Sequence, residues 1–219
     1  MTISIHQPAY LPWLGYFDKI INSDIFIYFN SVQFEKNSFI NRNKIKTPNG
    51  ESWLTIPVKT KDYKEKNISQ LEIDYSRNWI NSHLKTIESC YKKSVNYNKV
   101  FEVYKLSLEK EHVLLSDLCY EQLLCFLELL NVKDKIIIKS SSLNLQEKKS
   151  DLVLEICKHF KANTYLSGKF GSDYLLTDTF TENNIEIKFQ DFISPTYNQL
   201  WGSFIPNLGV IDYLMNNNI

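Results

Sequence analysis

The sequence predicts an α/β fold with a mostly parallel, open β-sheet. The first observation is the order of its segments, because short β-branched apolar runs alternate with runs of helical periodicity. The second is the opening of the chain, where a strand, a short helix and another strand follow one another within residues 3–29. Such a segment forms a right-handed βαβ unit if its strands are parallel. A Rossmann-like or nucleotidylyltransferase-like strand order is compatible with this pattern.

The first elements have clear boundaries. The strand Ile3–His6 ends before Pro8, which has no N–H group to donate to a sheet ladder. Pro12 suits the first turn of a helix that extends to about Ser23, since proline already has a helical φ angle. The apolar run Ile25–Phe29 then predicts the second strand.

The middle of the chain changes from strand to helix character. The alternating run at residues 53–58 predicts a strand, and Pro57 places it at a sheet edge or a strand end. A lysine-rich loop follows and closes in a short strand, Ile68–Ile73. Residues 77–132 then show helical spacing, which predicts three helices. We expect one domain, residues 1–219, with a helical insertion at about 77–132.

The last third of the chain returns to alternating strands and helices. We expect strands at residues 136–139, 164–166 and 185–189, and helices at residues 147–161 and 210–215. These elements complete the parallel sheet after the helical insertion.

The composition is that of an ordinary globular protein, with 43% hydrophobic and 14% aromatic residues. Its 25 basic and 25 acidic residues cancel, so no overall charge attracts DNA or an anionic membrane. No apolar run approaches the ~20 residues that span a bilayer, and no signal peptide is visible. We therefore expect a cytoplasmic protein with local anion sites only.

The cysteines predict neither a metal centre nor disulfides. Cys90, Cys119, Cys125 and Cys157 have no C-x-x-C spacing, and most of them fall on apolar faces of predicted helices. The motifs H-E-x-x-H and G-x-S-x-G are absent from the sequence, which removes the usual support for zinc-dependent and serine hydrolases. No metal ligand is predicted.

His6 and Gln7 follow the first predicted strand. In an open parallel sheet, ligands bind beyond the carboxyl ends of the strands where the strand order reverses. His6 is therefore a candidate general base, because imidazole titrates near neutral pH. The alternative is that His6 hydrogen-bonds a main-chain carbonyl and locks the turn.

A second cluster of polar groups follows the second strand. Arg42, one of only two arginines, stands between Asn41 and Asn43, and Gln33 and Lys36 precede it. A planar guanidinium suits a carboxylate or phosphate group, so this segment predicts an anion-binding site. An arginine that holds down a loop through a carboxylate is the competing interpretation.

Two further features indicate a functional site less specifically. Ser167, Gly168 and Gly171 follow a predicted strand, and this G-x-x-G turn would let the main chain approach a phosphate group, although an ordinary turn has the same pattern. His83 lies on the inward face of a predicted helix. It is a second catalytic candidate or a histidine of the core.

Five motifs carry a resemblance to a known family. They are H-Q-P-x-Y-L-P-W-L-G-Y-F-D-K-I at residues 6–20, V-Q-F-x-K-x-x-F-x-N-R-N-K-I at 32–45, W-L-T-I-P-V at 53–58, H-L-K-T-I-E-x-x-Y at 83–91 and Y-L-S-G-x-x-G-x-x-Y-L at 165–175. In content and order the chain resembles the WbqC-like family of bacterial proteins over nearly its whole length. That family is associated with gene clusters for O-antigen and other surface polysaccharides, and some members are provisionally described as glycine transferases.

The resemblance implies an enzyme of surface-polysaccharide biosynthesis. It would transfer a small acyl or aminoacyl group, such as glycyl, to the amine of a nucleotide-linked amino sugar. On this reading His6 takes the proton of the amine, and Arg42 and Lys36 hold a diphosphate or carboxylate. Gln7, Asn41 and Asn43 read hydroxyl groups, while Tyr16 and Gln33 are carried over as binding residues from the family pattern.

Several alternatives stay open. The protein could be a non-catalytic sugar-nucleotide-binding or scaffold component, with Trp13, Tyr16 and Trp201 as an aromatic platform, or an ATP-dependent adenylating enzyme for a small carboxylic acid. Acyl-coenzyme A, ATP, a carrier protein or a charged tRNA could supply the acyl group. The transfer hypothesis requires His6, Arg42 and Gly168 to surround one cleft.

Overall fold

The computed structural model describes residues 1–173 and 175–218 and divides the chain into two compact units. Unit 1 contains residues 1–7, 15–30 and 134–193, and unit 2 contains residues 8–14, 31–133 and 194–219. The predicted helical segment at 77–132 therefore belongs to a larger unit. Whether the two units fold as one domain stays a prediction.

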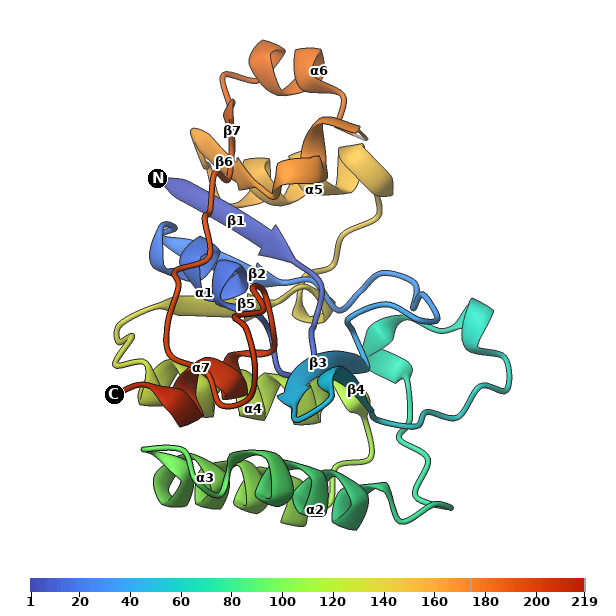
Figure 1. The fold of residues 1–219 in the computed structure, drawn as a ribbon. Coiled ribbons are helices and arrows are strands. Elements are labelled where there is room, and N and C mark those ends of the chain that lie inside the picture. The colour runs from blue at the N-terminus through green and yellow to red at the C-terminus, as the bar shows by residue number, and fades with distance from the viewer. Residues whose placement is uncertain (174, 219) are drawn as a thin grey trace. The chain divides into compact units, whose positions relative to one another are not determined.

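Unit 1 is a doubly wound parallel sheet, which confirms the predicted fold class. Its strands in the described residues are β1 (Thr2–His6), β2 (Ile25–Tyr28), β5 (Ile136–Lys139), β6 (Thr164–Ser167) and β7 (Glu186–Phe189). They are all parallel and lie in the order β5-β2-β1-β6-β7 (Figure 1). The chain moves outward through β2 and β5, then returns past β1 to form β6 and β7, which is the Rossmann arrangement.

The helices of unit 1 cover both faces of this sheet. They are α1 (Leu14–Ile21), whose first residue belongs to unit 2, α5 (Lys149–His159) and α6 (Thr177–Glu182). The β1–β2 and β5–β6 connections run in opposite directions, so right-handed crossovers place α1 and α5 on opposite faces. Figure 1 shows β1 between these two helices.

Unit 2 is a β-hairpin surrounded by helices. The hairpin consists of β3 (Arg42–Thr47) and β4 (Gly50–Thr55), which pair in antiparallel fashion. The helices are α2 (Trp79–Tyr91), α3 (Tyr97–Glu109), α4 (Leu115–Leu129) and α7 (Val210–Asn216), with α3 packed against α4 and α7. The three helices predicted within residues 77–132 are confirmed.

A buried carboxylate holds the irregular C-terminal segment in unit 2. Asp212 of α7 is fully buried and accepts hydrogen bonds from the hydroxyl groups of Tyr91 (2.7 Å) and Tyr197 (2.8 Å). Gln199 donates to the same carboxylate through Nε2, at 2.9 Å. Each carboxylate oxygen is thus hydrogen-bonded, which a buried charge requires.

Two sequence predictions differ from the structure. Ile68–Ile73 is not a strand, because it forms one 3-10 turn (Ile68–Gln70) followed by isolated bridges at Glu72 and Ile73. The strand expected at residues 53–58 begins earlier and ends before Pro57. Two elements were not predicted, namely strand β3 and helix α6.

Every helix in the described part of the chain is too short or too polar to cross a lipid bilayer.

Candidate functional site

The carboxyl edge of the sheet between β1 and β6 is the candidate site of unit 1. These two strands are neighbours, and the chain leaves them in opposite directions, toward β2 and toward β7. Crevices at such a reversal bind ligands in open α/β sheets. His6 ends β1 and Ser167 ends β6, so both residues stand at this edge as the sequence predicted.

The two compact units divide the predicted site residues. His6, Gln7, Tyr16, Ser167, Gly168 and Gly171 belong to unit 1, and Gln33, Lys36, Asn41, Arg42, Asn43 and His83 belong to unit 2. The expectation that His6, Arg42 and Gly168 share one cleft stays a prediction.

His6 and Ser167 point to opposite faces of the sheet. The Oγ of Ser4 lies 3.2 Å from the carbonyl oxygen of Lys19 in α1, and His6, two residues further along, faces the same side. Ser4 pairs with Leu166 across the β1–β6 ladder, so Ser167 faces the other side. The Ser167 hydroxyl and the His6 ring therefore lie on different faces of the sheet, although the main chain after β6 still lies at the same edge.

His6 contacts the turn that follows it. Its Nδ1 lies 3.0 Å from the carbonyl oxygen of Gln7, and its ring centroid lies 4.7 Å from that of Tyr16. A carbonyl oxygen only accepts hydrogen bonds, so the Nδ1 atom carries the proton and Nε2 carries the lone pair. Burial and the positive charge of Lys19 lower the pKa of His6 to about 3, although the bond to Gln7 opposes this shift. The ring is neutral at physiological pH.

Lys19 is a buried ammonium group that the sequence analysis did not select. Its side chain is only 2% exposed, and Nζ donates to the carbonyl oxygen of Ile5 at 2.7 Å. Burial lowers the pKa of Lys19 from 10.5 to about 7. The burial of Lys19 could have been predicted from helical spacing. Lys19 lies three residues after Tyr16 and directly before Ile20, and all three are buried residues of α1.

Gln190 also belongs to this edge and was not predicted. Its main-chain N–H donates to the carbonyl oxygen of Ser167 at 2.9 Å. Its side-chain Nε2 donates to the carbonyl oxygen of Gly15 at 2.7 Å and to Oδ2 of Asp18 at 2.6 Å. The residue connects the end of β6 to α1, and its position directly after the last predicted strand was the available signal.

The G-x-x-G turn has two glycines with different surroundings. Gly171 lies in the 3-10 turn Lys169–Asp173, and a Cβ atom there would lie 1.9 Å from the Oγ of Ser167. A Cβ atom at Gly168 would have no described atom within 4 Å. Gly171 is therefore required for packing, whereas Gly168 leaves open space beside the end of β6.

The two asparagines of unit 2 are committed to the main chain. Asn43 is fully buried, and its Nδ2 donates to the carbonyl oxygens of Leu11 (2.6 Å) and Tyr10 (3.2 Å). Asn41 is also buried and donates to the carbonyl oxygen of Ile56 at 2.9 Å. These contacts fix the hairpin, so a role of the asparagines in reading ligand hydroxyls stays a prediction.

The cations of the same segment lie on aromatic rings. The Arg42 guanidinium carbon lies 4.3 Å from the centroid of Trp53, and Lys36 Nζ lies 4.2 Å from that of Tyr63. Gln33 is exposed and forms a single bridge with Asn67. These side chains remain accessible from solvent, unlike the asparagines.

His83 is a buried member of a hydrogen-bond chain. Its Nε2 lies 3.2 Å from the carbonyl oxygen of Thr55, so this nitrogen carries the proton and Nδ1 accepts from the hydroxyl of Tyr10 at 2.9 Å. The Tyr10 oxygen in turn accepts from Tyr104 at 2.6 Å. Burial lowers the pKa of His83 to about 4. Both ring nitrogens are engaged, which suits the core role; the catalytic role stays a prediction.

One of the three rings considered for an open aromatic platform, Tyr16, is not open to solvent. Tyr16 is fully buried and donates to the carbonyl oxygen of Gln7 at 3.1 Å. Trp201 is partly buried, and its Nε1 donates to the carbonyl oxygen of Cys90 at 2.9 Å. These two rings are fixed by packing within their own units.

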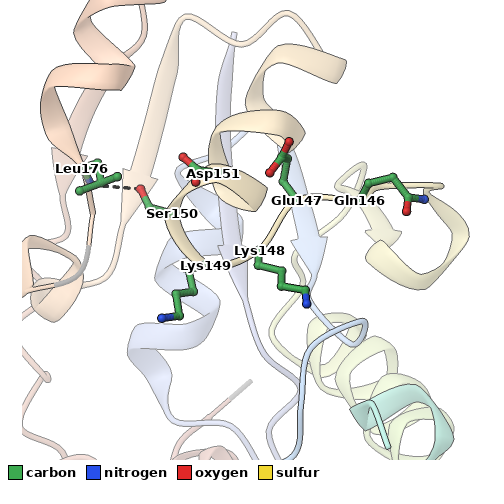
Figure 2. Close-up of a pocket in the computed structure, with 7 residues that line it drawn as sticks. All are labelled: Gln146, Glu147, Lys148, Lys149, Ser150, Asp151 and Leu176. Atoms are coloured by element: carbon green, nitrogen blue, oxygen red, sulfur yellow. Dashed lines mark hydrogen bonds between the residues drawn. The ribbon is translucent and has the colours of Figure 1, made fainter. Parts of the chain in front are cut away.

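A pocket of about 420 Å³ lies at the start of α5 in unit 1 (Figure 2). It is lined by Gln146, Glu147, Lys148, Lys149, Ser150, Asp151 and Leu176. The Oγ of Ser150 accepts a hydrogen bond from the Leu176 main chain at 3.0 Å. Figure 2 shows the two lysines extending to the side opposite the two acidic residues, so the cations do not converge with them on one point. None of the predicted site residues lines this pocket.

The sheet and its central reversal define a doubly wound α/β protein. The sequence profile of the WbqC-like protein family matches residues 7–219, and the chain belongs to this family. The chain is also 30% identical over 216 residues to a protein of Mycobacterium tuberculosis described as uncharacterized protein Rv1507c. That alignment covers 98% of this chain and 93% of the relative. No solved structure matches the chain.

Proposed function

We propose that this protein is an enzyme of surface-polysaccharide biosynthesis. It transfers a small acyl or aminoacyl group to the amine of a nucleotide-linked amino sugar. The observation that carries the proposal is the position of His6 at the end of β1, beside the point where the strand order reverses. The family assignment agrees with an enzyme of this kind and leaves its donor and acceptor open.

The chemistry assigned to His6 is removal of a proton. When the amine attacks the acyl carbon, a C–N bond forms and the bond to the leaving group breaks. The nitrogen is then an ammonium that must lose one proton, and Nε2 of a neutral imidazole accepts it. A pKa of about 3 makes the His6 ring a weak base in the unliganded protein, so this role requires a bound substrate that raises the pKa of the ring.

A non-catalytic binding component is the second candidate. The hydrogen bond between His6 and the Gln7 carbonyl favours it, since this contact is the one expected of a histidine that locks a turn. Both candidates predict binding of a sugar nucleotide by the folded protein. They differ in whether the imidazole takes part in a reaction.

The binding step can be tested first. UDP- and dTDP-linked amino sugars, each alone and with acetyl-coenzyme A or with ATP and glycine, are screened for an increase in melting temperature. Turnover is then measured by mass spectrometry as an acyl addition to the sugar nucleotide. If no nucleotide-linked amino sugar binds, both candidates are wrong.

Two substitutions of His6 separate the candidates. In His6→Asn the amide nitrogen occupies the place of Nδ1 and can still donate to the Gln7 carbonyl, whereas the Nε2 lone pair is lost. We expect this variant to stay folded and to bind the ligand but to lose turnover, with a lower melting temperature because the ring contact with Tyr16 is removed. In His6→Gln the amide reaches the Nε2 position instead, so the turn contact is lost and stability falls. Wild-type turnover in His6→Asn would support the turn-locking role.

A further inference from the structure

We propose that unit 2 carries an oligosaccharide-binding surface on the outer face of the β3–β4 hairpin. The surface consists of three aromatic rings, Trp13, Phe39 and Trp53, together with the guanidinium of Arg42; we call the three rings the aromatic row. The proposal does not depend on the transfer reaction at His6, because all four residues belong to unit 2.

The aromatic row is continuous and open to solvent. The ring centroids of Trp13 and Phe39 lie 5.7 Å apart, and those of Phe39 and Trp53 lie 5.6 Å apart. Phe39 is 44% exposed, Trp53 is 40% exposed and Trp13 is partly exposed. Adjacent large aromatic rings on a surface are costly unless something covers them, and such patches mark binding sites.

The pairing of the hairpin produces this surface. Lys44 of β3 pairs with Trp53 of β4, so their side chains lie on the same face, and Arg42 lies on that face two residues before Lys44. The opposite face carries Asn43, Ile45 and Leu54, which are buried in unit 2. The core therefore takes one face of the hairpin and leaves the aromatic face outward.

Arg42 supplies polar recognition beside the rings. Its guanidinium stacks on Trp53 with 4.3 Å between the guanidinium carbon and the ring centroid, and one nitrogen donates to the carbonyl oxygen of Asn37. Its Nε is buried and has no hydrogen-bond partner among the described residues, so only the terminal nitrogens can meet a ligand. A stacked guanidinium held in this way presents N–H groups in a fixed plane, which suits paired hydroxyls or the carboxylate of an acidic sugar.

The charge of the surface favours a saccharide over a nucleic acid. Lys44 forms an ion pair with Glu51, whereas Arg42 forms no ion pair with an acidic side chain in the described part of the chain. Single-stranded nucleic acids need a cationic groove that follows several phosphates. A saccharide needs aromatic rings for the C–H faces of its sugars and a few donors for its hydroxyls, and this surface supplies both.

The test measures binding to printed glycans. The intact protein is applied to an array of bacterial surface glycans and oligosaccharides, with oligo(dT) spotted as the nucleic acid. The retained oligosaccharide is then titrated calorimetrically into the protein and its variants. Trp53→Ala and Phe39→Ala should each weaken binding by about tenfold or more, because each removes a large apolar contact. Trp53→Phe should restore most of it.

Tyr75→Ala is the matched control. Tyr75 also belongs to unit 2 and is 44% exposed, the same fraction as Phe39, but it lies outside the aromatic row. Its removal should leave the affinity unchanged, and melting temperatures verify that every variant is folded. The proposal is wrong if no glycan is retained, or if oligo(dT) is retained instead. It is also wrong if a retained glycan binds Trp53→Ala and Phe39→Ala normally, or if these variants dissociate a dimer seen by light scattering.

Discussion

The Cα atom of Gly171 lies so close to the side chain of Ser167 that a Cβ atom on Gly171 would not fit between them. A Cβ atom on Gly171 would lie 1.9 Å from the Ser167 Oγ and 3.0 Å from its Cβ. The Ser167 hydroxyl is fully buried and has no hydrogen-bond partner among the described residues. This contact holds the 3-10 turn over the end of β6.

The first prediction concerns this contact. Gly171→Ala should lower the free energy of unfolding by about 1–3 kcal/mol, because overpacking forces the turn or the strand to shift. Chemical denaturation measures the change. Ser167→Gly in the same chain should recover much of the loss, since it removes the two nearest atoms that the new methyl group meets and leaves only Leu175 Cδ1, at 3.2 Å.

Gly168 provides the control for that experiment. A Cβ atom there meets no described atom within 4 Å, so Gly168→Ala should change the unfolding free energy by no more than about 0.5 kcal/mol. Equal losses at the two glycines would contradict the packing explanation.

The second prediction concerns the buried ammonium group of Lys19. Its pKa is about 7 in the folded protein and 10.5 when exposed, so the unfolded chain binds more protons between pH 7 and 10.5. The free energy of unfolding should therefore rise with pH across this window, by on the order of 5 kcal/mol from this group. Lys19→Met should abolish that rise in denaturation curves recorded at several pH values. The exposed Lys85 is the control, and Lys85→Met should retain the rise.

The third prediction concerns the two imidazoles that were catalytic candidates. The pKa of His6 is lowered to about 3 and that of His83 to about 4, from 6.5. Their ring signals in NMR spectra should stay constant between about pH 5 and 8, where an exposed histidine titrates. Because the folded pKa values are the lower ones, the unfolded chain binds more protons below pH 6.5, and stability should fall on acidification. Titration of either ring near pH 6.5 would contradict its placement.

The fourth prediction concerns the Tyr104–Tyr10–His83 chain. Tyr10→Phe removes the central hydroxyl and leaves the Tyr104 hydroxyl and the His83 Nδ1 without this partner. We expect a loss of about 1–3 kcal/mol in unfolding free energy. Tyr104→Phe leaves only the Tyr10 oxygen without a donor and should cost less, and thermal unfolding of the two variants compares them. The reverse order would contradict the central position of the Tyr10 hydroxyl between Tyr104 and His83.

Local patterns were sufficient to predict most of the sheet. The first two strands end where proline or polar residues follow an apolar run, and the structure places them as β1 and β2. Strand β3 was missed because apolar and polar residues do not alternate clearly along it. Its inward residues include the polar Asn43, and its outward Lys46 is nevertheless buried, so neither face looks apolar or polar throughout.

The candidate site was less predictable, because side chains of one type serve different purposes in it. The position of His6 follows from the strand before it, but its contact with Gln7 depends on the path of the turn. Asn43 was predicted to read ligand hydroxyls, and nothing in the sequence indicated that its Nδ2 donates to the Leu11 carbonyl, 32 residues away in the chain. Lys19 was not selected from the sequence, and its contact with the Ile5 carbonyl depends on the packing of α1 against β1. Such partners are set by tertiary structure, which a pattern along the chain does not encode.

The way in which the two compact units are threaded has a practical consequence. The backbone passes from one to the other after residues 7, 14, 30, 133 and 193, so neither corresponds to a continuous stretch of gene. Cutting the polypeptide at any single bond would leave at least one of them incomplete, and dissecting the protein by truncation would yield fragments that lack part of a hydrophobic core. Exchanging one compact unit between related proteins would therefore require several junctions in the chain.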